Sequence, residues 1–566
     1  MKKYLLLTLM CMMCVWHANA QEFVNIGGHI LPVSSIKKIT PTYQEHSASL
    51  SVLLKNDKSI SLYVAALEAT GCIDSLKCYT DPSYGFVSEQ ARLDSCYWTN
   101  DDLCIFTDMS YDNVAYPDQR YYNFTAFMVP DAVLAEKYGI TDLDGLRAKA
   151  KELYDPVYPE DAEVADETDR RNSLNRFISY HILNRWGTYY TLTAYDNNKL
   201  ANNFFRRKID IADWYETLMP HSLMKFSFPS GTQAGLYINR RGVQSREDER
   251  GVYIRGAMVE PSLLGAAALG INGAYHYIDD IAAYDEQTQK VVLDERMRIN
   301  CTTLSPDFMT KLSDGSTARG HVTTNPANDG RYGRGGQSAI AANNTDHAVG
   351  FKPYFVRNFE FTRDIHLHVS VRTLKTDLYQ GDAVIVKGPY DLKVKLPSLP
   401  AGKYEVRLGT MVGLTSLGVI QFYIDDIPQG EPCDMRQDAV TLFGYKSDAQ
   451  ILDNSSYNNY SYDEEDATEE EKAIIAAYEK EIRALGWMKG PHSYIWGEND
   501  SWGGTTFRNQ NNTVRKIIGT FTTDGKSDHY LRLQQMMGSG GKLDFDYIEL
   551  VPESVYDNAE FPETLW

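Results

Sequence analysis

The spacing of apolar residues changes along the chain, and the change predicts two kinds of structure. Between residues 49 and 285, apolar residues recur every three or four positions among short apolar runs, which predicts helices mixed with strands. From residue 351 onward, apolar and polar residues alternate in successive runs, which predicts antiparallel strands. Two consecutive helices are predicted near residues 50–54 and 60–67, with Ser59 as the N-cap of the second and Gly71 as its stop.

The stretch YNFTAFMVPDAV, residues 122–133, predicts a buried strand that turns directly into a helix. Residues 124–129 are nearly all apolar, and Pro130 sets the φ angle that a first helical turn requires. Asp131 then places a negative charge at the positive end of this helix, which is predicted to end at Gly139.

Shorter elements follow this helix. A second helix is predicted at residues 174–183, after an acidic surface loop at residues 156–169. The predicted strands are residues 189–194, 223–228, 235–239, 252–256 and 271–282, and Asn272–Gly273 forms the turn into the last of them.

Two of these segments resemble signature segments of the fasciclin domain. They are FISYHIL at residues 177–183 and NGAYHYIDDI at residues 272–281. The resemblance covers residues 42–284, and the stretch at residues 122–133 is similar to the first signature box of that family. It implies an α+β fold and a non-catalytic role in adhesion or binding.

The resemblance has departures, and it bears on particular residues. Val129 and Pro130 stand where the family has proline followed by threonine. Tyr180 and His181 match a segment that is tied to adhesion in some relatives. From the residues themselves, His181 and His276 are predicted to be core histidines whose ring nitrogens bond backbone groups, rather than ligands or bases.

A change of composition after residue 285 predicts a connection between two domains. Residues 289–299 are compatible with one strand, and the Gly-rich and Asn-rich stretch 324–344 has no sustained apolar period. The predicted organisation is a signal peptide at 1–20, a fasciclin-like domain with a Cys-bearing insertion at 21–285, a connecting segment at 286–350 and a β-sandwich at 351–566.

The C-terminal half is predicted to be an all-β jelly-roll sandwich. The segments AGKYEVRLGT, QFYIDDI and LDFDYIEL are its clearest alternating runs, and they look like strands of a galactose-binding or carbohydrate-binding module. One helix interrupts the strands at residues 473–485, after a run of acids that suits a helix N-terminus. Its predicted inner face is Ile474, Ile475, Tyr478, Ile482 and Leu485.

The first twenty residues predict export. Two lysines precede an apolar run at residues 4–16, and Ala18–Ala20 forms an A-x-A cleavage site, so the mature chain is expected to begin at Gln21. The product is expected in the periplasm or at the cell surface, since no later segment is apolar for long enough to span a bilayer. The net charge is −20, which disfavours nucleic acid and anionic membranes as partners.

The cysteines that follow the cleavage site fall into two groups. Cys72, Cys78, Cys96 and Cys104 lie close together in sequence, and two local disulfides are predicted because exported proteins meet an oxidising environment. Free thiols and a metal site are the alternatives, although the spacing lacks a zinc knuckle. The remaining two, Cys301 and Cys433, either pair or stay buried and reduced.

Motifs for catalysis are missing from the sequence, so no enzymatic activity and no cofactor are predicted. His366 and His368 share a strand face, but two ligands do not make a metal site. The pair 425–426 is predicted to lie on a strand and to point to opposite faces, which weakens it as an acid/base pair. Asp544 and Asp546 share a face, where a structural calcium ion could stabilise the sandwich.

The stretch GWMKGPHSYIWGENDSWGGTTFR, residues 486–508, is the strongest candidate for ligand binding. Exposed aromatic rings flanked by fixed polar groups recognise the apolar faces and the hydroxyls of sugars. The alternative is that these tryptophans fill the open ends of the sandwich. The candidate residues are Trp487, Trp496, Trp502, Asn499 and Arg508.

These patterns predict a secreted, non-enzymatic recognition protein. Its expected partner is a glycan or a cell-surface protein, in adhesion or as an accessory to carbohydrate uptake. One alternative is a structural or assembly protein of the cell envelope. The other is a glycoside hydrolase that acts through a pair of carboxylates.

Overall fold

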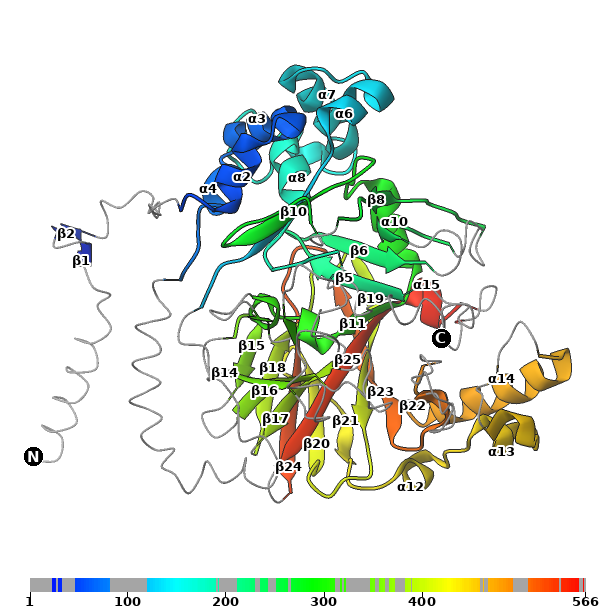
Figure 1. The fold of residues 1–566 in the computed structure, drawn as a ribbon. Helices are drawn as coiled ribbons and strands as arrows, with labels where there is room; N and C mark the ends of the chain where they lie inside the picture. The colour runs from blue at the N-terminus through cyan, green and yellow to red at the C-terminus, as the bar shows by residue number, and fades with distance from the viewer. Residues whose placement is uncertain are drawn as a thin grey trace, which may run out of the picture. The chain divides into compact units, whose positions relative to one another are not determined.

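The computed structural model describes residues 23–26, 29–32, 46–81, 120–189, 192, 211–229, 235–242, 251–262, 266–310, 316–317, 320–321, 347–351, 356–361, 366–371, 382–387, 389–458, 462, 467–491, 507–538, 541–558 and 563. The chain divides into two units, Met1–Glu45 and His46–Trp566. The first contains the hairpin of β1 (Phe23–Ile26) and β2 (His29–Pro32). The second unit is a mixture of helices and mostly antiparallel sheets (Figure 1).

The N-terminal part of this unit begins with a group of helices, coloured blue to cyan in Figure 1. Its helices are α2 (Leu50–Asn56), α3 (Ser61–Ala69), α4 (Cys72–Ser75), α6 (Asp131–Tyr138), α7 (Leu143–Tyr154) and α8 (Ser173–Tyr180). Leu54, Leu67 and Tyr154 are fully buried among them. The Asp131 carboxylate accepts hydrogen bonds from the backbone N–H groups of Ser61 and Leu62, so it caps α3 as well as beginning α6.

The segment between α4 and β3 leaves and re-enters the fold through a closed stem. Asp81 N–H donates to the Arg120 carbonyl at 2.9 Å, and Tyr122 N–H donates to the Tyr79 carbonyl at 2.8 Å. The Arg120 guanidinium also pairs with the Asp81 carboxylate. Residues on either side of the predicted Cys-bearing insertion are therefore adjacent in space.

A four-stranded sheet adjoins these helices. Its order is β4 (Ile182–Leu183), β3 (Phe124–Met128), β10 (Gly273–Tyr277) and β9 (Ala268–Leu269), and β3 and β10 run parallel. Gly273 is required here, because a Cβ atom on it would lie 2.5 Å from the Phe124 carbonyl oxygen. The buried Asn272 side chain accepts from Leu50 N–H and donates to the carbonyls of Leu76 and Cys78, which ties three elements together.

A second four-stranded sheet is antiparallel throughout. It consists of β5 (Ile211–Glu216), β6 (Leu223–Phe228), β7 (Leu236–Ile238) and β8 (Ala257–Val259). Phe226 of β6 contacts Phe127 of β3 at 5.2 Å between ring centroids, so the two small sheets share a core.

Two larger sheets make up the C-terminal half. The eight-stranded sheet contains β11 (Met297–Asn300), β14 (His347–Phe351), β16 (His366–Val371), β17 (Asp382–Lys387), β19 (Gly402–Met411), β22 (Trp487–Lys489), β23 (Thr513–Thr523) and β25 (Lys542–Pro552). The five-stranded sheet contains β15 (Phe359–Phe361), β18 (Asp391–Lys395), β20 (Val419–Ile424), β21 (Ile427–Asp434) and β24 (Tyr530–Met537). Phe359 and Phe545 meet between the two sheets, an arrangement compatible with a β-sandwich.

The central strand β25 joins the two halves of the sequence. Along one edge it pairs with β19, and along the other it pairs first with β17 and then with β11. β11 follows helix α10 (Glu286–Asp294), within the segment that the sequence predicts to be a connection. That segment therefore contributes a strand to the main sheet.

Several predicted elements are confirmed and others are wrong in detail. The strand at 223–228, the strand over LDFDYIEL and the helix stop at Gly139 are confirmed. The helix at 174–183 ends at Tyr180, because the next residues pair with β3 as β4. The predicted strand 289–299 is mostly α10, which Asp285 caps by accepting from Thr288 N–H.

Other corrections concern caps, turns and faces. Ser59 does not cap α3; it bonds Asp57 in a preceding 3-10 turn. Residues 425–426 are not on a strand, because both have positive φ and form the tight turn between β20 and β21. In α14 (Glu469–Ala484), Ile475 and Ile482 are buried as predicted, but Ile474 is exposed.

Candidate functional site

A pocket of about 650 Å³ opens beside the two helices that follow β21. Amide side chains dominate its lining, with one tyrosine and one apolar residue. The lining residues are Val440, Tyr445, Ser447, Gln450, Asn509, Gln510, Asn511 and Asn512. Such a surface offers both hydrogen-bond donors and acceptors together with an aromatic ring.

Short helices position the lining residues. α12 (Ala439–Phe443) is followed by its cap Gly444, which adopts positive φ, and α13 (Asp448–Leu452) starts four residues after Gly444. Ser447 and Gln450 form a capping box on α13, with each side chain bonding the backbone N–H of the other. The other wall is the end of the 3-10 turn η14 (Phe507–Asn509) and the three residues that precede β23.

A buried charge cluster lies beneath this pocket. The Asp448 carboxylate accepts from the Lys489 ammonium at 2.7 Å, from Arg508 Nε at 2.9 Å and from Tyr462 N–H at 2.9 Å. Arg508 also pairs with Glu479 of α14 at 2.7 Å. The side chains of Asp448, Lys489 and Arg508 are fully buried, so they support the pocket without facing it.

The cluster fixes two of the pocket residues directly. Tyr445 donates its hydroxyl to the Arg508 carbonyl at 2.9 Å, and Asn509 Oδ1 accepts from Asp448 N–H at 3.0 Å. Side chains held by buried partners lose little freedom when a ligand binds. The pocket is therefore largely preformed on this side.

Burial and charge shift the titration of the cluster. Burial would raise the pKa of Asp448, but the charges of Arg508 and Lys489 outweigh it and lower the pKa to about 2. Burial, together with the charge of Arg508, lowers the pKa of Lys489 to about 8. Burial would lower the pKa of Arg508, but Asp448 and Glu479 raise it above its usual value.

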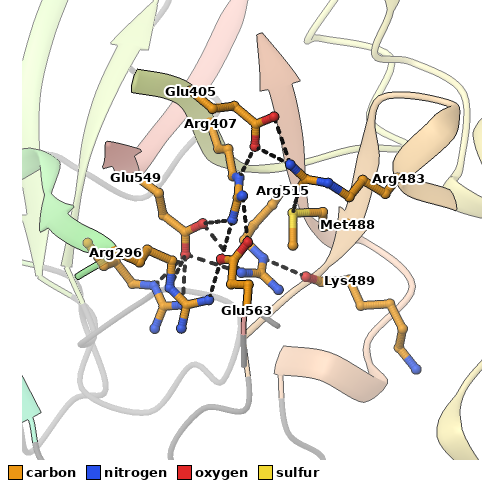
Figure 2. Close-up of polar contacts among 10 residues, drawn as sticks. Arg296, Glu405, Arg407, Arg483, Met488, Lys489, Arg515, Glu549 and Glu563 are labelled. Atoms are coloured by element: carbon orange, nitrogen blue, oxygen red, sulfur yellow. Dashed lines mark hydrogen bonds and ion pairs between the residues drawn. The ribbon is translucent and has the colours of Figure 1, made fainter. Parts of the chain in front are cut away.

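A second buried cluster adjoins the first through Lys489. Arg515 Nε donates to the Lys489 carbonyl at 2.8 Å, while the Lys489 side chain extends away toward Asp448 (Figure 2). Arg515 and Arg407 both contact the Glu549 carboxylate on β25. Arg407 also bonds Glu563, and Glu405 pairs with Arg483 of α14. The charged groups thus form a continuous polar region along β19, β23 and β25.

The predicted binding residues divide between the core and the segment outside the described residues. Trp487 is buried and stacks on Phe443 at 5.3 Å, as the packing alternative for the tryptophans requires. Arg508 is in the buried cluster. Trp496, Asn499 and Trp502 lie outside the described residues.

The ends of that segment are nevertheless placed. The described chain stops at Pro491, two residues after Lys489 of β22, and resumes at η14, which contains Arg508. Lys489 and Arg508 bind the same Asp448 carboxylate. The described residues on either side of the three remaining candidates therefore lie at the cluster below the pocket.

Tyr180 and His181, the segment matched to adhesion, are buried in the N-terminal part. The Tyr180 hydroxyl donates to the Leu223 carbonyl at 2.9 Å. His181 Nδ1 bonds the Phe177 carbonyl at 2.7 Å, and its Nε2 lies 3.2 Å from the Tyr63 hydroxyl. Neither side chain is accessible in this conformation.

His276 is buried as well, which agrees with the prediction of core histidines. Its Nε2 bonds the Gly187 carbonyl at 3.0 Å, and its ring stacks on Phe127 at 5.3 Å. Burial lowers the pKa of both His181 and His276 to about 4, so both are neutral at pH 7. Among the residues that the structure describes, no group of acids gathers with these two histidines around a common site.

The cysteine predictions are only partly covered by the described residues. Cys72 and Cys78 are buried and do not form a disulfide with each other, while Cys96 and Cys104 lie outside the description. The described pair Cys301 and Cys433 is likewise not disulfide-bonded.

The described residues contain neither a metal-binding cluster nor a membrane-spanning helix. No group of three His, Cys, Asp or Glu side chains there is arranged to hold a metal ion. Asp544 and Asp546, the residues considered for calcium, are buried, and Asp544 is paired with Lys542 at 3.1 Å. No helix in the described ranges is both long and apolar enough to cross a membrane.

Comparisons with known proteins add little. No protein-family model matches the chain, and no curated protein is similar to it. One solved structure with a local match is a xanthan lyase from Paenibacillus, at 13% identity and a TM-score of 0.18. The match covers 33% of this chain and 11% of that one, and a likeness this weak supports no conclusion about fold or activity.

The tryptophan-containing stretch that the sequence favours ends next to the pocket, but the pocket itself is not predicted from the sequence. The run Asn509–Asn512 is four consecutive amide residues directly after the tryptophan-containing stretch, and this composition was the available signal. Tyr445, Ser447 and Gln450 come from a segment some sixty residues earlier, which no local pattern connects to that run.

Proposed function

We propose that this protein is an exported, non-enzymatic recognition protein that binds a glycan in the amide-lined pocket. The observation that carries the proposal is the lining itself, in which Tyr445 and four consecutive amide residues, Asn509–Asn512, are held over a buried charge cluster. Amides match the paired donor and acceptor character of sugar hydroxyls, and a tyrosine ring matches a sugar's apolar face.

The same proposal assigns a domain to each half of the chain. The N-terminal half is proposed to be a fasciclin-like domain, supported by the parallel pairing of β3 and β10, which contain the segments similar to the family's two boxes. The C-terminal half is proposed to be a jelly-roll sandwich of the carbohydrate-binding type. Export is proposed with cleavage after Ala20, and N-terminal sequencing of the mature protein is expected to begin at Gln21.

A glycan array with the purified protein tests the binding proposal. Asn511 is exposed and lines the pocket, so Asn511→Ala is expected to weaken a genuine signal by about tenfold, the loss of one to two hydrogen bonds. Asn56→Ala serves as the matched control, because Asn56 is an equally exposed amide on α2, outside the pocket lining.

Two further variants test the part of the proposal that rests on sequence. Trp496→Ala and Trp502→Ala are expected to reduce the same signal if their segment contributes to binding. If the wild-type protein binds no glycan on the array, glycan recognition is contradicted and a protein partner in the envelope is favoured. Release of shorter sugars from a bound glycan would contradict the non-enzymatic assignment.

A further inference from the structure

The arginines around Glu549 contact two carboxylates that are held in very different ways (Figure 2). Glu549 belongs to the central strand β25, is fully buried, and pairs in register with Arg407 of β19 and Arg298 of β11. It is a fixed counter-charge of the sheet. Glu563, in contrast, follows α15 (Glu553–Tyr556) and belongs to no described helix or strand.

The Glu563 carboxylate is bound as a ligand would be. Arg407 donates two parallel hydrogen bonds to it, from Nη1 to Oε1 at 2.6 Å and from Nη2 to Oε2 at 2.7 Å. Arg296 adds a third bond to Oε1 at 2.7 Å. A two-pronged contact between a guanidinium and a planar carboxylate is among the strongest and most specific ion pairs in proteins.

The receiving groups are already fixed without Glu563. Arg407 is fully buried and donates Nε to Glu405 at 2.6 Å and Nη1 to Glu549 at 3.2 Å. Beside it, Arg515 is fully buried and donates Nε to the Lys489 carbonyl, but its Nη2 has no hydrogen-bond partner among the described residues. Arg515 Nη2 is therefore a buried hydrogen-bond donor that Glu563 leaves unused and that a larger ligand could engage.

We propose that Arg296 and Arg407 form a carboxylate-binding site that Glu563 occupies from within the chain, with Arg515 beside Arg407 on the shared partner Glu549, and that the carboxylate of an acidic sugar takes its place when Glu563 leaves. A uronate has the same planar group as Glu563, and its ring hydroxyls can accept from Arg515 Nη2. The site is separate from the amide-lined pocket, and the inference does not rest on binding there.

Glu563 competes with a free uronate for the arginines, and this competition decides whether uronate binding can be measured. A group tethered by a short segment competes at an effective concentration in the millimolar range. A free uronate therefore binds the wild-type chain only weakly. Removing the Glu563 carboxylate removes this competition and leaves the arginines in place.

The test is calorimetric titration of the full-length chain with glucuronate, at constant ionic strength, in three forms. Glu563→Ala is expected to bind glucuronate at least about tenfold more tightly than wild type, since it lacks the internal competitor. Glu563→Gln keeps the side-chain shape and is expected to lie between the two. Glu553→Ala is the control, because Glu553 forms an exposed ion pair with Lys403 and is expected to behave as wild type.

Glucose and sulfate complete the design. Neither is expected to bind Glu563→Ala comparably, since glucose lacks the charge and sulfate lacks the planar group. Equal, weak heats for glucuronate in all forms would overturn the proposal. Should Glu563→Ala fail to fold, recovery of its folding by glucuronate but not glucose supports the site, and absence of recovery overturns it.

The two proposals fail independently. Asn511→Ala combined with Glu563→Ala is expected to bind glucuronate as Glu563→Ala does, because Asn511 lines only the pocket. Loss of glucuronate binding in that combination would place the ligand in the pocket and overturn the arginine site.

Discussion

Asp448 is the residue on which the support of the pocket depends most. Its carboxylate is the shared partner of two fully buried cations, Lys489 and Arg508, and its own N–H holds the pocket residue Asn509. Desolvated charges are tolerated only while they remain paired, because water is not available to replace a lost partner.

Replacing this carboxylate is expected to be costly. Asp448→Asn leaves Lys489 and Arg508 with reduced counter-charge and is expected to lower the free energy of unfolding by roughly 3–5 kcal/mol. Urea denaturation at pH 7 measures the change. Asp434→Asn breaks a partly exposed pair with Arg436 and is expected to cost less than about 1 kcal/mol; similar losses in both variants would contradict the role given to Asp448.

The buried histidines are expected to make stability depend on pH. Their pKa of about 4 in the folded chain is below the unfolded value of about 6.5, so the unfolded chain binds more protons between these limits. Stability is therefore complete above about pH 6.5 and falls as the pH drops toward 4. At 1.36 kcal/mol per pKa unit, each histidine contributes at most about 3 kcal/mol to this fall.

A variant that cannot bind a proton at position 276 separates the contribution of His276 to the pH dependence of stability. His276→Gln can still donate to the Gly187 carbonyl but cannot take up a proton, so stability is expected to fall less between pH 6.5 and 4.5. The measurement is the free energy of unfolding from urea curves across this range. His46→Gln, at an exposed histidine, is the control, and an unchanged pH slope in His276→Gln would contradict the assignment.

At the scale of elements, β19 shows how a strand can require the absence of a side chain. Gly409 pairs across from Tyr547 of β25, and a Cβ atom on it would lie 2.1 Å from the tyrosine ring. The ring covers the position that a side chain would otherwise fill, as aromatic residues do beside glycines in other sheets.

This contact predicts a difference between two glycines of the same strand. Gly409→Ala displaces the Tyr547 ring and is expected to destabilise the protein by about 1–3 kcal/mol. Gly402→Ala meets its nearest neighbour, Leu293, at 3.4 Å and is expected to be nearly neutral. Thermal unfolding of both variants gives the comparison, and equal midpoints would show that the ring moves without cost.

The type and the ends of a helix or strand were predictable from sequence where a single local pattern determines them. β6 and β25 alternate or run apolar between clear turn signals, and their bounds follow from sequence. α10 was mistaken for a strand because its valines, Val291 and Val292, favour strands, whereas the Asp285 cap and tertiary packing decide for a helix. The turn at 425–426 was not recognised in the sequence, because aspartate adopts positive φ less often than glycine or asparagine and so gives a weaker turn signal.

In the candidate site, too, local sequence patterns do not reveal which distant residues become partners. Arg508 and Trp487 were singled out for ligand contact, yet they pack in the core, since nothing local reveals Asp448 and Phe443 as their partners. A buried ion pair between residues sixty positions apart is a property of the fold. The tryptophan stretch ends at Arg508, and the pocket wall begins at the next residue, Asn509.

At the scale of the whole molecule, β11 makes the C-terminal sheet depend on residues outside the predicted sandwich. It pairs with the second half of β25, and Arg298 donates to Glu549 at 2.8 Å. A domain boundary drawn at residue 351 would remove this strand and expose the edge of β25.

Two fragments test that dependence. Residues 286–566 retain β11 and are expected to give a soluble, cooperatively unfolding protein. Residues 351–566 leave Tyr547–Leu550 without an edge partner and Glu549 without Arg298, and are expected to aggregate or to unfold at lower urea. Size-exclusion chromatography and urea curves distinguish them, and equal behaviour would show that the sandwich is autonomous.

The closed stem formed by Tyr79–Asp81 and Arg120–Tyr122 has a practical consequence. Its two arms meet through backbone hydrogen bonds, so a different connection between them is expected to leave these bonds in place. A tight Asn-Gly linker could join the arms directly, or a foreign reporter peptide could be grafted between them. The stem is thus a ready insertion point for labelling this protein.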